Sequence, residues 1–181
     1  ITPEMQARSI AAVNELNQQR LDASAQQEIA SRIRNYELAF RMQSAAPELS
    51  DLSGESPATL EAYGLNRVDT KGFESSFARN CLLARRLVER GTRFVTLFLS
   101  TWDQHSKLDS QLAANTKISD QPVSALLTDL KERGLLDETL VVWGGEFGRT
   151  PLGENRSGFK TVTGRDHHPY SFSLWMAAGA V

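Results

Sequence analysis

The sequence predicts an α/β protein with a mostly parallel sheet, preceded by a helical segment. Residues 93–99 and 139–143 are almost entirely apolar, as expected for strands that are covered on both faces. Each of these segments follows an amphipathic helical pattern that ends in Glu-Arg-Gly, so the same helix-to-strand unit occurs twice. Alternating helices and buried strands of this kind are typical of a sheet with helices on both sides.

Residues 1–46 are expected to form a helical hairpin. Thr2 and Pro3 suit the start of a first helix, because threonine is a good N-cap and proline fits the first helical position. A second helix is expected over about 24–44, where apolar residues recur at helical spacing. Pro47 is expected to end this region.

A connector rich in Pro, Gly, Ser and Asp is expected over residues 47–72, with a short helix near 57–62. Residues 73–181 are then expected to form the α/β portion, and Gly91 is well placed as the left-handed cap of its first helix. The next helix ends in Glu-Arg-Gly, and Pro122 is expected at its start or at a kink.

The C-terminal part is expected to contain a long loop and a third strand. Residues 144–170 form a loop with several glycines, and a loop of this length in a compact domain is usually functional or disordered. Residues 171–177 are expected to form the third strand.

Composition and charge exclude several classes of function. With 20 basic and 22 acidic residues, the formal net charge is −2, which gives no electrostatic reason to expect nucleic acid or an anionic membrane as partner. No apolar run approaches the roughly 18 residues of a transmembrane helix. Cys81 is the single cysteine, so no disulfide can form within the chain, and its place on an apolar stripe predicts a buried side chain. The chain starts at Ile1 without a signal sequence, and both ends are expected to be cuts in a longer protein.

All three histidines fall in polar loops near predicted strand ends. His105 follows the first strand, Glu146 follows the second, and His167 and His168 lie in the long loop. In open α/β sheets ligands bind beyond the carboxyl ends of the strands. Carboxylates and imidazoles are suitable ligands for Zn²⁺, Mn²⁺ or Mg²⁺. The sequence therefore predicts a metal site whose candidate ligands are Asp103, His105, Glu146, His167 and His168, with the choice between the two adjacent histidines left open.

Two arginines in the same loops could bind a tetrahedral anion. Arg149 and Arg165 carry planar guanidinium groups that can donate two hydrogen bonds to a phosphate or sulfate. Other interpretations stay open, because Glu146 could cap a helix or pair with Arg149, and the histidines could be ordinary loop residues. The sequence has no phosphate-binding loop of the Walker type, no G-x-S-x-G elbow and no CxxC pair.

Three loop motifs carry a resemblance to a known family. They are WDQH at residues 102–105, VVWGGEFGRTP at residues 141–151, and GRDHHP at residues 164–169. Through these motifs the chain resembles the DUF1501 family, a bacterial group allied to the alkaline-phosphatase/sulfatase superfamily. The resemblance extends over residues 10–181.

The resemblance implies an alkaline-phosphatase-like α/β/α sandwich, of which this chain would form a part. It implies a phosphate or sulfate ester as substrate and a divalent Zn, Mn, Mg or Ca ion as cofactor. Full-length relatives look exported, so a periplasmic or otherwise exported protein is expected. The early segment that carries an Asp and the nucleophile in the superfamily is missing from this chain, and the isolated chain is therefore expected to be inactive.

The ligand pattern carries over residue by residue. Asp103 and His105 look like the middle Asp and His of the superfamily. Glu146 takes the place of the later Asp, and His167 or His168 looks like the last His before an edge strand.

Phe147 departs from the superfamily pattern, because it stands where many members have a histidine. A second metal is therefore expected to be weak, different or absent. The alternative function is a non-enzymatic binding or assembly module whose metal site has degenerated. Sheet edges left open by the missing early strands would favour self-association of the chain.

Overall fold

The computed structural model describes residues 2–24, 27–66, 73–153 and 163–179. The chain divides into two compact units, Ile1–Leu52 and Ser53–Val181, which are described separately. Among the described residues, no helix is both long enough and apolar enough to cross a membrane.

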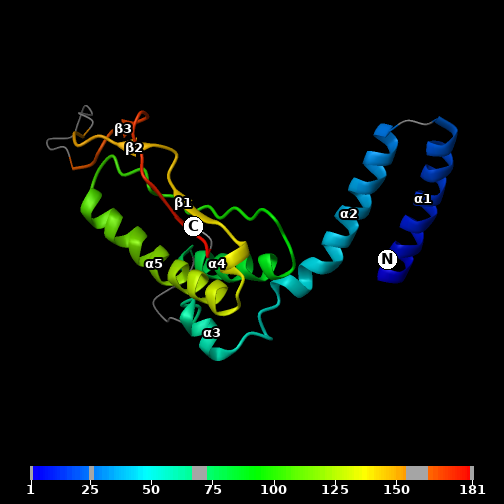
Figure 1. The fold of residues 1–181 in the computed structure, drawn as a ribbon, viewed down its shortest axis with the longest axis horizontal. Helices are drawn as coiled ribbons and strands as arrows, with labels where there is room; N and C mark the ends of the chain where they lie inside the picture. The colour runs from blue at the N-terminus through cyan, green and yellow to red at the C-terminus, as the bar shows by residue number, and fades with distance from the viewer. Residues whose placement is uncertain (1, 25–26, 67–72, 154–162, 180–181) are drawn as a thin grey trace. The chain divides into compact units, whose positions relative to one another are not determined.

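The first unit is a pair of helices. Helix α1 (Pro3–Ser24) lies beside α2 (Gln27–Ser50), and the chain reverses direction between them (Figure 1). The amide of Asn14 donates to Glu37 Oε1 across the pair at 2.9 Å. Pro47 was expected to end the second helix, but it lies inside α2. Proline removes only one helical hydrogen bond, and the ladder resumes at once, with the Asp51 amide donating to the Pro47 carbonyl at 3.0 Å.

Among its described residues, the second unit contains three helices, a 3₁₀ turn and four short strands. Two of the strands form one antiparallel pair, β1 with β4, and the other two form a second antiparallel pair, β2 with β3. The elements are α3 (Pro57–Ala62), α4 (Phe73–Glu89), α5 (Leu108–Glu132), η1 (Leu136–Glu138), β1 (Val141–Gly144), β2 (Gly148–Arg149), β3 (His167–His168) and β4 (Leu174–Ala177).

The predicted α/β/α sandwich with a mostly parallel sheet is wrong for the described residues. They are rich in helix and contain only the two short antiparallel pairs. Residues 93–99, expected to form the first strand, belong to no strand. Their side chains still alternate, since Val95 and Leu97 are half-buried while Phe94 and Phe98 are 89% and 86% exposed. An apolar segment forms a strand only where a neighbouring strand can pair with its backbone N–H and C=O groups. The described residues provide no such neighbouring strand beside residues 93–99.

The other predicted strands form in part. β1 covers the end of the apolar segment 139–143, and β4 covers the end of segment 171–177. They pair with each other in antiparallel register, with Trp143 opposite Trp175. The two indole rings stack with centroids 6.1 Å apart. Several large apolar side chains are exposed in the described residues. Self-association of the chain, which was expected from open sheet edges, stays a prediction.

The helices of the second unit agree more closely with the sequence. α3 begins after Ser56, whose hydroxyl accepts from the Thr59 amide at 3.0 Å. Gly91, with φ of 81°, ends α4 as predicted, and the next amide bonds back to the Leu87 carbonyl at 3.0 Å. Pro122, expected at a start or kink, lies well inside α5.

Packing of α4 against α5 forms the core of the second unit. Cys81 is fully buried there, as predicted, and burial raises the pKa of its thiol to about 12. The buried apolar residues are Tyr63, Phe77, Ala78, Cys81, Leu82, Ala84, Ala125, Leu126 and Leu130.

A buried arginine ties the two core helices together. Arg85 on α4 is only 3% exposed, and its guanidinium contacts Glu55 at 2.6 Å, Glu89 at 2.6 Å and Asp129 of α5 at 2.9 Å. The Tyr63 hydroxyl donates to the same Asp129 carboxylate at 3.0 Å. Burial alone would lower the pKa of Arg85, but its hydrogen bonds to Glu89 and Glu55 raise the pKa above its ordinary value. The arginine is therefore charged inside the core.

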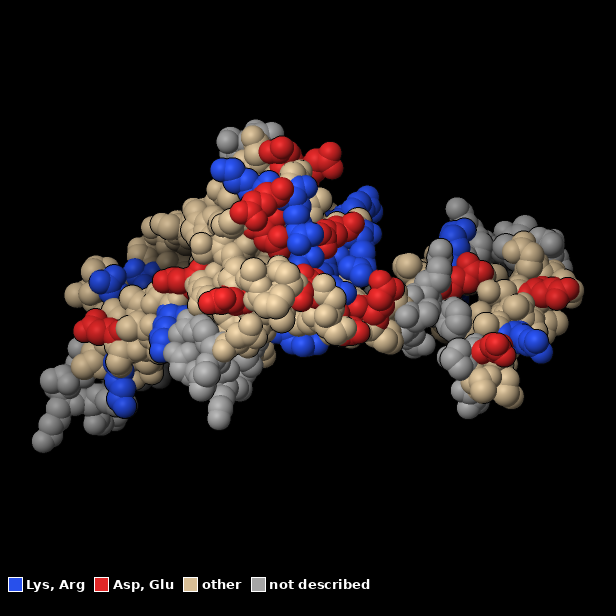
Figure 2. All heavy atoms as spheres, turned by 90° about the horizontal axis from the view of Figure 1, so that it is seen from below, with Lys and Arg blue, Asp and Glu red and all other residues tan. Residues whose placement is uncertain are grey.

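On the face that Figure 2 draws, acidic and basic side chains are interspersed.

Replacing Arg85 with methionine should destabilise the second unit by about 1–3 kcal/mol, because three carboxylates would lose their shared buried partner. The loss is limited because Glu55 keeps Arg86 as a partner, and Glu89 and Asp129 keep Arg133. Denaturant-induced unfolding measures this change. Arg93→Met removes an exposed arginine and should change the free energy of unfolding by less than about 0.5 kcal/mol. Equal stability of the two variants would contradict a structural role for the buried cluster.

Candidate metal centre

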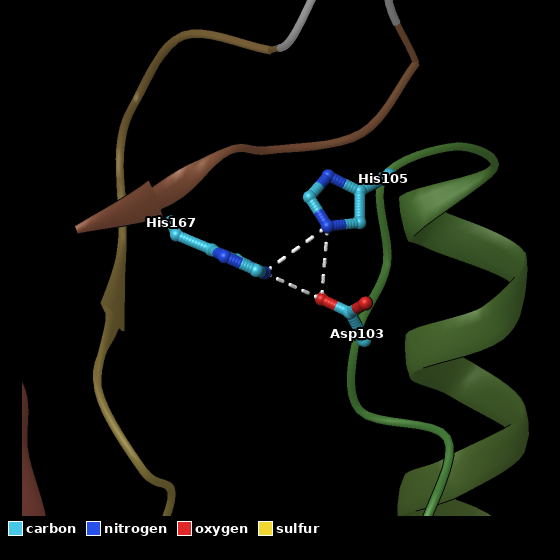
Figure 3. Close-up of side chains that lie close together, drawn as sticks. All are labelled: Asp103, His105 and His167. Carbon is cyan, nitrogen blue, oxygen red and sulfur yellow. Dashed lines mark hydrogen bonds and ion pairs between the residues drawn. The ribbon is translucent and has the colours of Figure 1, made fainter. Parts of the chain in front are cut away.

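Three side chains from two distant stretches of the chain converge at one point (Figure 3). Asp103 and His105 belong to the loop that precedes α5, and His167 begins β3. Asp103 Oδ1 lies 2.8 Å from His167 Nε2 and 3.0 Å from His105 Nε2, and the two imidazole nitrogens are 3.1 Å apart. Among the described residues, this is the group of histidine and acidic side chains that could hold a metal ion.

The three atoms have the spacing of a metal ligand set. Zn–N and Zn–O bonds of about 2.0–2.1 Å in a tetrahedral site place neighbouring ligand atoms roughly 3.3–3.4 Å apart. The observed separations of 2.8–3.1 Å differ from this by a few tenths of an ångström. Two imidazoles and one carboxylate suit Zn²⁺, Mn²⁺ or Fe²⁺, and three protein donors leave further coordination positions open.

The strand register selects one of the two adjacent histidines. In the β2–β3 pair, Arg149 lies opposite His167 and Gly148 lies opposite His168. Successive residues of a strand point to opposite faces, so only one histidine can face Asp103. That residue is His167.

His168 points away from the three-residue group. Its ring lies edge-on to Tyr170 with centroids 6.2 Å apart. His168 is described by the structure, but it does not belong to the group around Asp103.

The loop that carries Asp103 and His105 is fixed by polar side chains that the sequence analysis did not identify. Asn115 of α5 is buried, and its amide donates to the Thr101 carbonyl at 2.6 Å. Gln104 is also buried and donates to the same carbonyl at 2.8 Å. Asparagine is a poor helix former, so its presence inside α5 was a sequence signal that Asn115 makes a contact outside its own helix.

Arg149 and Phe147 flank the three-residue group. Arg149 Nη2 lies 2.7 Å from Asp103 Oδ1 and donates to the Trp102 carbonyl at 3.3 Å. The Phe147 ring packs against the His167 imidazole with centroids 4.5 Å apart. One carboxylate oxygen therefore faces two imidazoles and a guanidinium.

These contacts hold the Asp103 carboxylate in its ionised form. Hydrogen bonds from His167 and then from Arg149 lower the pKa of Asp103 from 3.8 to about 2, although its partial desolvation acts in the opposite direction. The side chain is 59% exposed, so water screens part of this effect.

The remaining predicted site residues lie outside the group. Glu146 is exposed and is not among the three side chains that converge. Arg165 is exposed as well, and its backbone amide donates to the Gln104 carbonyl at 3.0 Å. The structure therefore brings together Asp103, His105 and His167, with Arg149 beside them.

Protonation of Asp103 should loosen these contacts in acid. Because the folded-state pKa is depressed, the carboxylate contributes stability above its ordinary pKa of 3.8, and that contribution is lost as the pH falls toward about 2. Asp103→Asn should therefore unfold at a slightly lower temperature than the parent near neutral pH, and the difference should shrink between about pH 4 and pH 2. Thermal unfolding of the parent and of Asp103→Asn, each in the presence of a chelator, measures the difference in unfolding temperature at each pH. Asp120→Asn, which removes an exposed carboxylate of α5, is the matched control, and a difference that persists unchanged to pH 2 would contradict the assignment.

Comparison with known proteins gives one match. The family described as "Protein of unknown function (DUF1501)" matches residues 1–181. No curated protein and no solved structure matches the chain significantly. Because the family match extends over the whole sequence, the chain belongs to the DUF1501 family.

Proposed function

We propose that this chain carries the metal-binding part of a metal-dependent hydrolase that cleaves phosphate or sulfate esters. The observation that supports the proposal is the convergence of Asp103 Oδ1 with the Nε2 atoms of His105 and His167, all within 3.1 Å of one another. A divalent cation bound by three protein donors lowers the pKa of a bound water and polarises an ester oxygen. The three side chains would hold such an ion on one side only.

Arg149 supports an anionic substrate. Its Nη2 atom is engaged by Asp103, which fixes the plane of the guanidinium. The Arg149 side chain is 21% exposed, so part of it is open to solvent beside Asp103. A guanidinium held in this way can donate to a tetrahedral oxyanion bound beside Asp103.

The resemblance to the alkaline-phosphatase/sulfatase superfamily supports the same proposal. Asp103 and His105 correspond to the middle ligand pair, and His167 corresponds to the last His. Phe147 packs on His167 where many superfamily members have another ligand, which favours a single ion. Export of the natural full-length protein is part of this proposal.

The donor set also favours a second candidate function. Two histidines and one carboxylate form the ligand set of non-haem Fe(II) oxygenases, which keep the other coordination positions open. This alternative predicts uptake of O₂ by the Fe²⁺-loaded protein, whereas a hydrolase works with Zn²⁺ or Mn²⁺ in the absence of O₂. A chain that folds and binds none of these ions would instead favour the non-enzymatic binding or assembly module.

Removing a ligand should weaken binding of the cation strongly. Calorimetric titration of the chain with Zn²⁺, Mn²⁺ or Co²⁺ should give one binding site. His105→Ala and His167→Ala should each lower the affinity by at least about 100-fold, since loss of a partner outside the ligand shell already costs 10- to 100-fold. His168→Ala is the matched control, because that ring is adjacent in sequence but faces Tyr170. Equal losses in all three variants would contradict the ligand assignment.

Hydrolysis of an aryl phosphate and an aryl sulfate by the natural full-length protein tests the reaction. The metal-loaded protein should release the aryl alcohol, and His105→Ala should abolish the release. Arg149→Met should lower kcat by roughly 100- to 1,000-fold, as expected for loss of a donor to the developing negative charge. Hydrolysis that survives His105→Ala and His167→Ala would exclude this site as its source.

A further inference from the structure

The two loops that carry the candidate ligands are joined by hydrogen bonds that backbone amides donate. The Leu108 amide donates to the Thr163 carbonyl at 2.8 Å, and the Lys107 amide donates to the Thr163 hydroxyl at 3.0 Å. On the other side, the Arg165 amide donates to the Gln104 carbonyl at 3.0 Å. These bonds bracket Gly164.

At Gly164 the two backbones touch. A Cβ atom placed on this residue would lie 2.0 Å from the carbonyl carbon of His105, 2.3 Å from its oxygen and 2.4 Å from the Ser106 amide nitrogen. All three are backbone atoms, so no side-chain rotation could relieve the overlap. Gly164 has no positive φ, so the position requires glycine for space and not for its conformational freedom.

We propose that Gly164 is a positioning residue of the metal centre, which sets the distance between His105 and His167 through the direct contact of the two loops. The proposal rests on the proposed function, because it assumes that these histidines bind an ion. It adds a residue that contacts neither the ion nor a substrate.

The size of the overlap explains why the centre should be sensitive to this position. Ordinary contact begins near 3.4 Å, so an alanine methyl must move away from the His105 carbonyl carbon by more than an ångström. Metal–ligand distances tolerate only about 0.2 Å of error. His167 follows three residues after Gly164 on the same loop, so the displacement would reach the ligand before the chain could absorb it.

Titration with Co²⁺, followed by visible absorption and calorimetry, tests the proposal. Gly164→Ala should bind Co²⁺ roughly 10- to 100-fold more weakly than the parent and should show a changed absorption spectrum, as expected when a residue that orients ligands is lost. Gly145→Ala is the matched control, because a Cβ there meets Phe147 O at an ordinary 3.6 Å. Circular dichroism and thermal unfolding with a chelator confirm that both variants fold. Unchanged Co²⁺ affinity in folded Gly164→Ala overturns the proposal.

A double-mutant cycle separates positioning from a general loss of stability. If Gly164→Ala acts by displacing His105, then His105→Ala should cost much less affinity in the Gly164→Ala chain than in the parent. Additive losses would overturn the proposal. If Gly164→Ala does not fold, Thr163→Val is the second variant, because it removes the hydroxyl that accepts from the Lys107 amide and so loosens the same contact between the two loops. Unchanged Co²⁺ affinity in that variant would show that this contact does not set the ligand distance, which also overturns the proposal.

The parent chain distinguishes the two possible failures. A parent that binds no Co²⁺, Zn²⁺ or Mn²⁺ refutes the proposed function, and the role of Gly164 is refuted with it. A parent that binds while Gly164→Ala binds equally well refutes the role of Gly164 alone.

Discussion

The ion pair between Arg85 of α4 and Asp129 of α5 is the contact on which the second unit depends. Arg85 is buried in the packed helix interface and Asp129 is 15% exposed, so water screens this pair much less than a surface ion pair. Glu55 and Glu89 balance the remaining donors of the same guanidinium, and Tyr63 bonds to Asp129. This cluster links α4 to α5, and the loop that carries Asp103 and His105 is bonded to α5 through Asn115.

Helix α5 connects the core of the second unit to the loop that carries Asp103 and His105. Asn115 is buried on this helix, and its amide holds the Thr101 carbonyl at the start of the ligand-bearing loop. Thr101 has φ of 78°, so the backbone turns sharply there, and the Gln104 side chain also donates to the Thr101 carbonyl. The loop is thus fixed at its base, and Asp103 and His105 point from it toward β3.

Sequence patterns predicted the local features of this chain better than its sheet. The cap at Gly91, the short helix after Ser56 and the burial of Cys81 depend on a few neighbouring residues, so a local pattern contains the required information. The predicted parallel sheet was wrong, because residues 93–99 need a partner strand that no local pattern can supply.

The candidate site likewise combines features that depend on neighbouring residues with features that depend on distant ones. Asp103 and His105 could be paired from their spacing, but the choice of His167 depends on the β2–β3 register. Neither that register nor the close approach at Gly164 is visible in the sequence.

The exposure of Asp103 shows that backbone contacts, more than charge, must hold the site together. Its carboxylate is more than half exposed, and an exposed ion pair contributes little because water and salt screen it. The contacts to His105, His167 and Arg149 therefore cannot by themselves keep two loops in place. The backbone bonds around Thr163, the close contact at Gly164 and the pairing of β2 with β3 do so without relying on charge. Such a framework keeps the three donor atoms together before any ion arrives, which lowers the cost of ordering them when the ion binds.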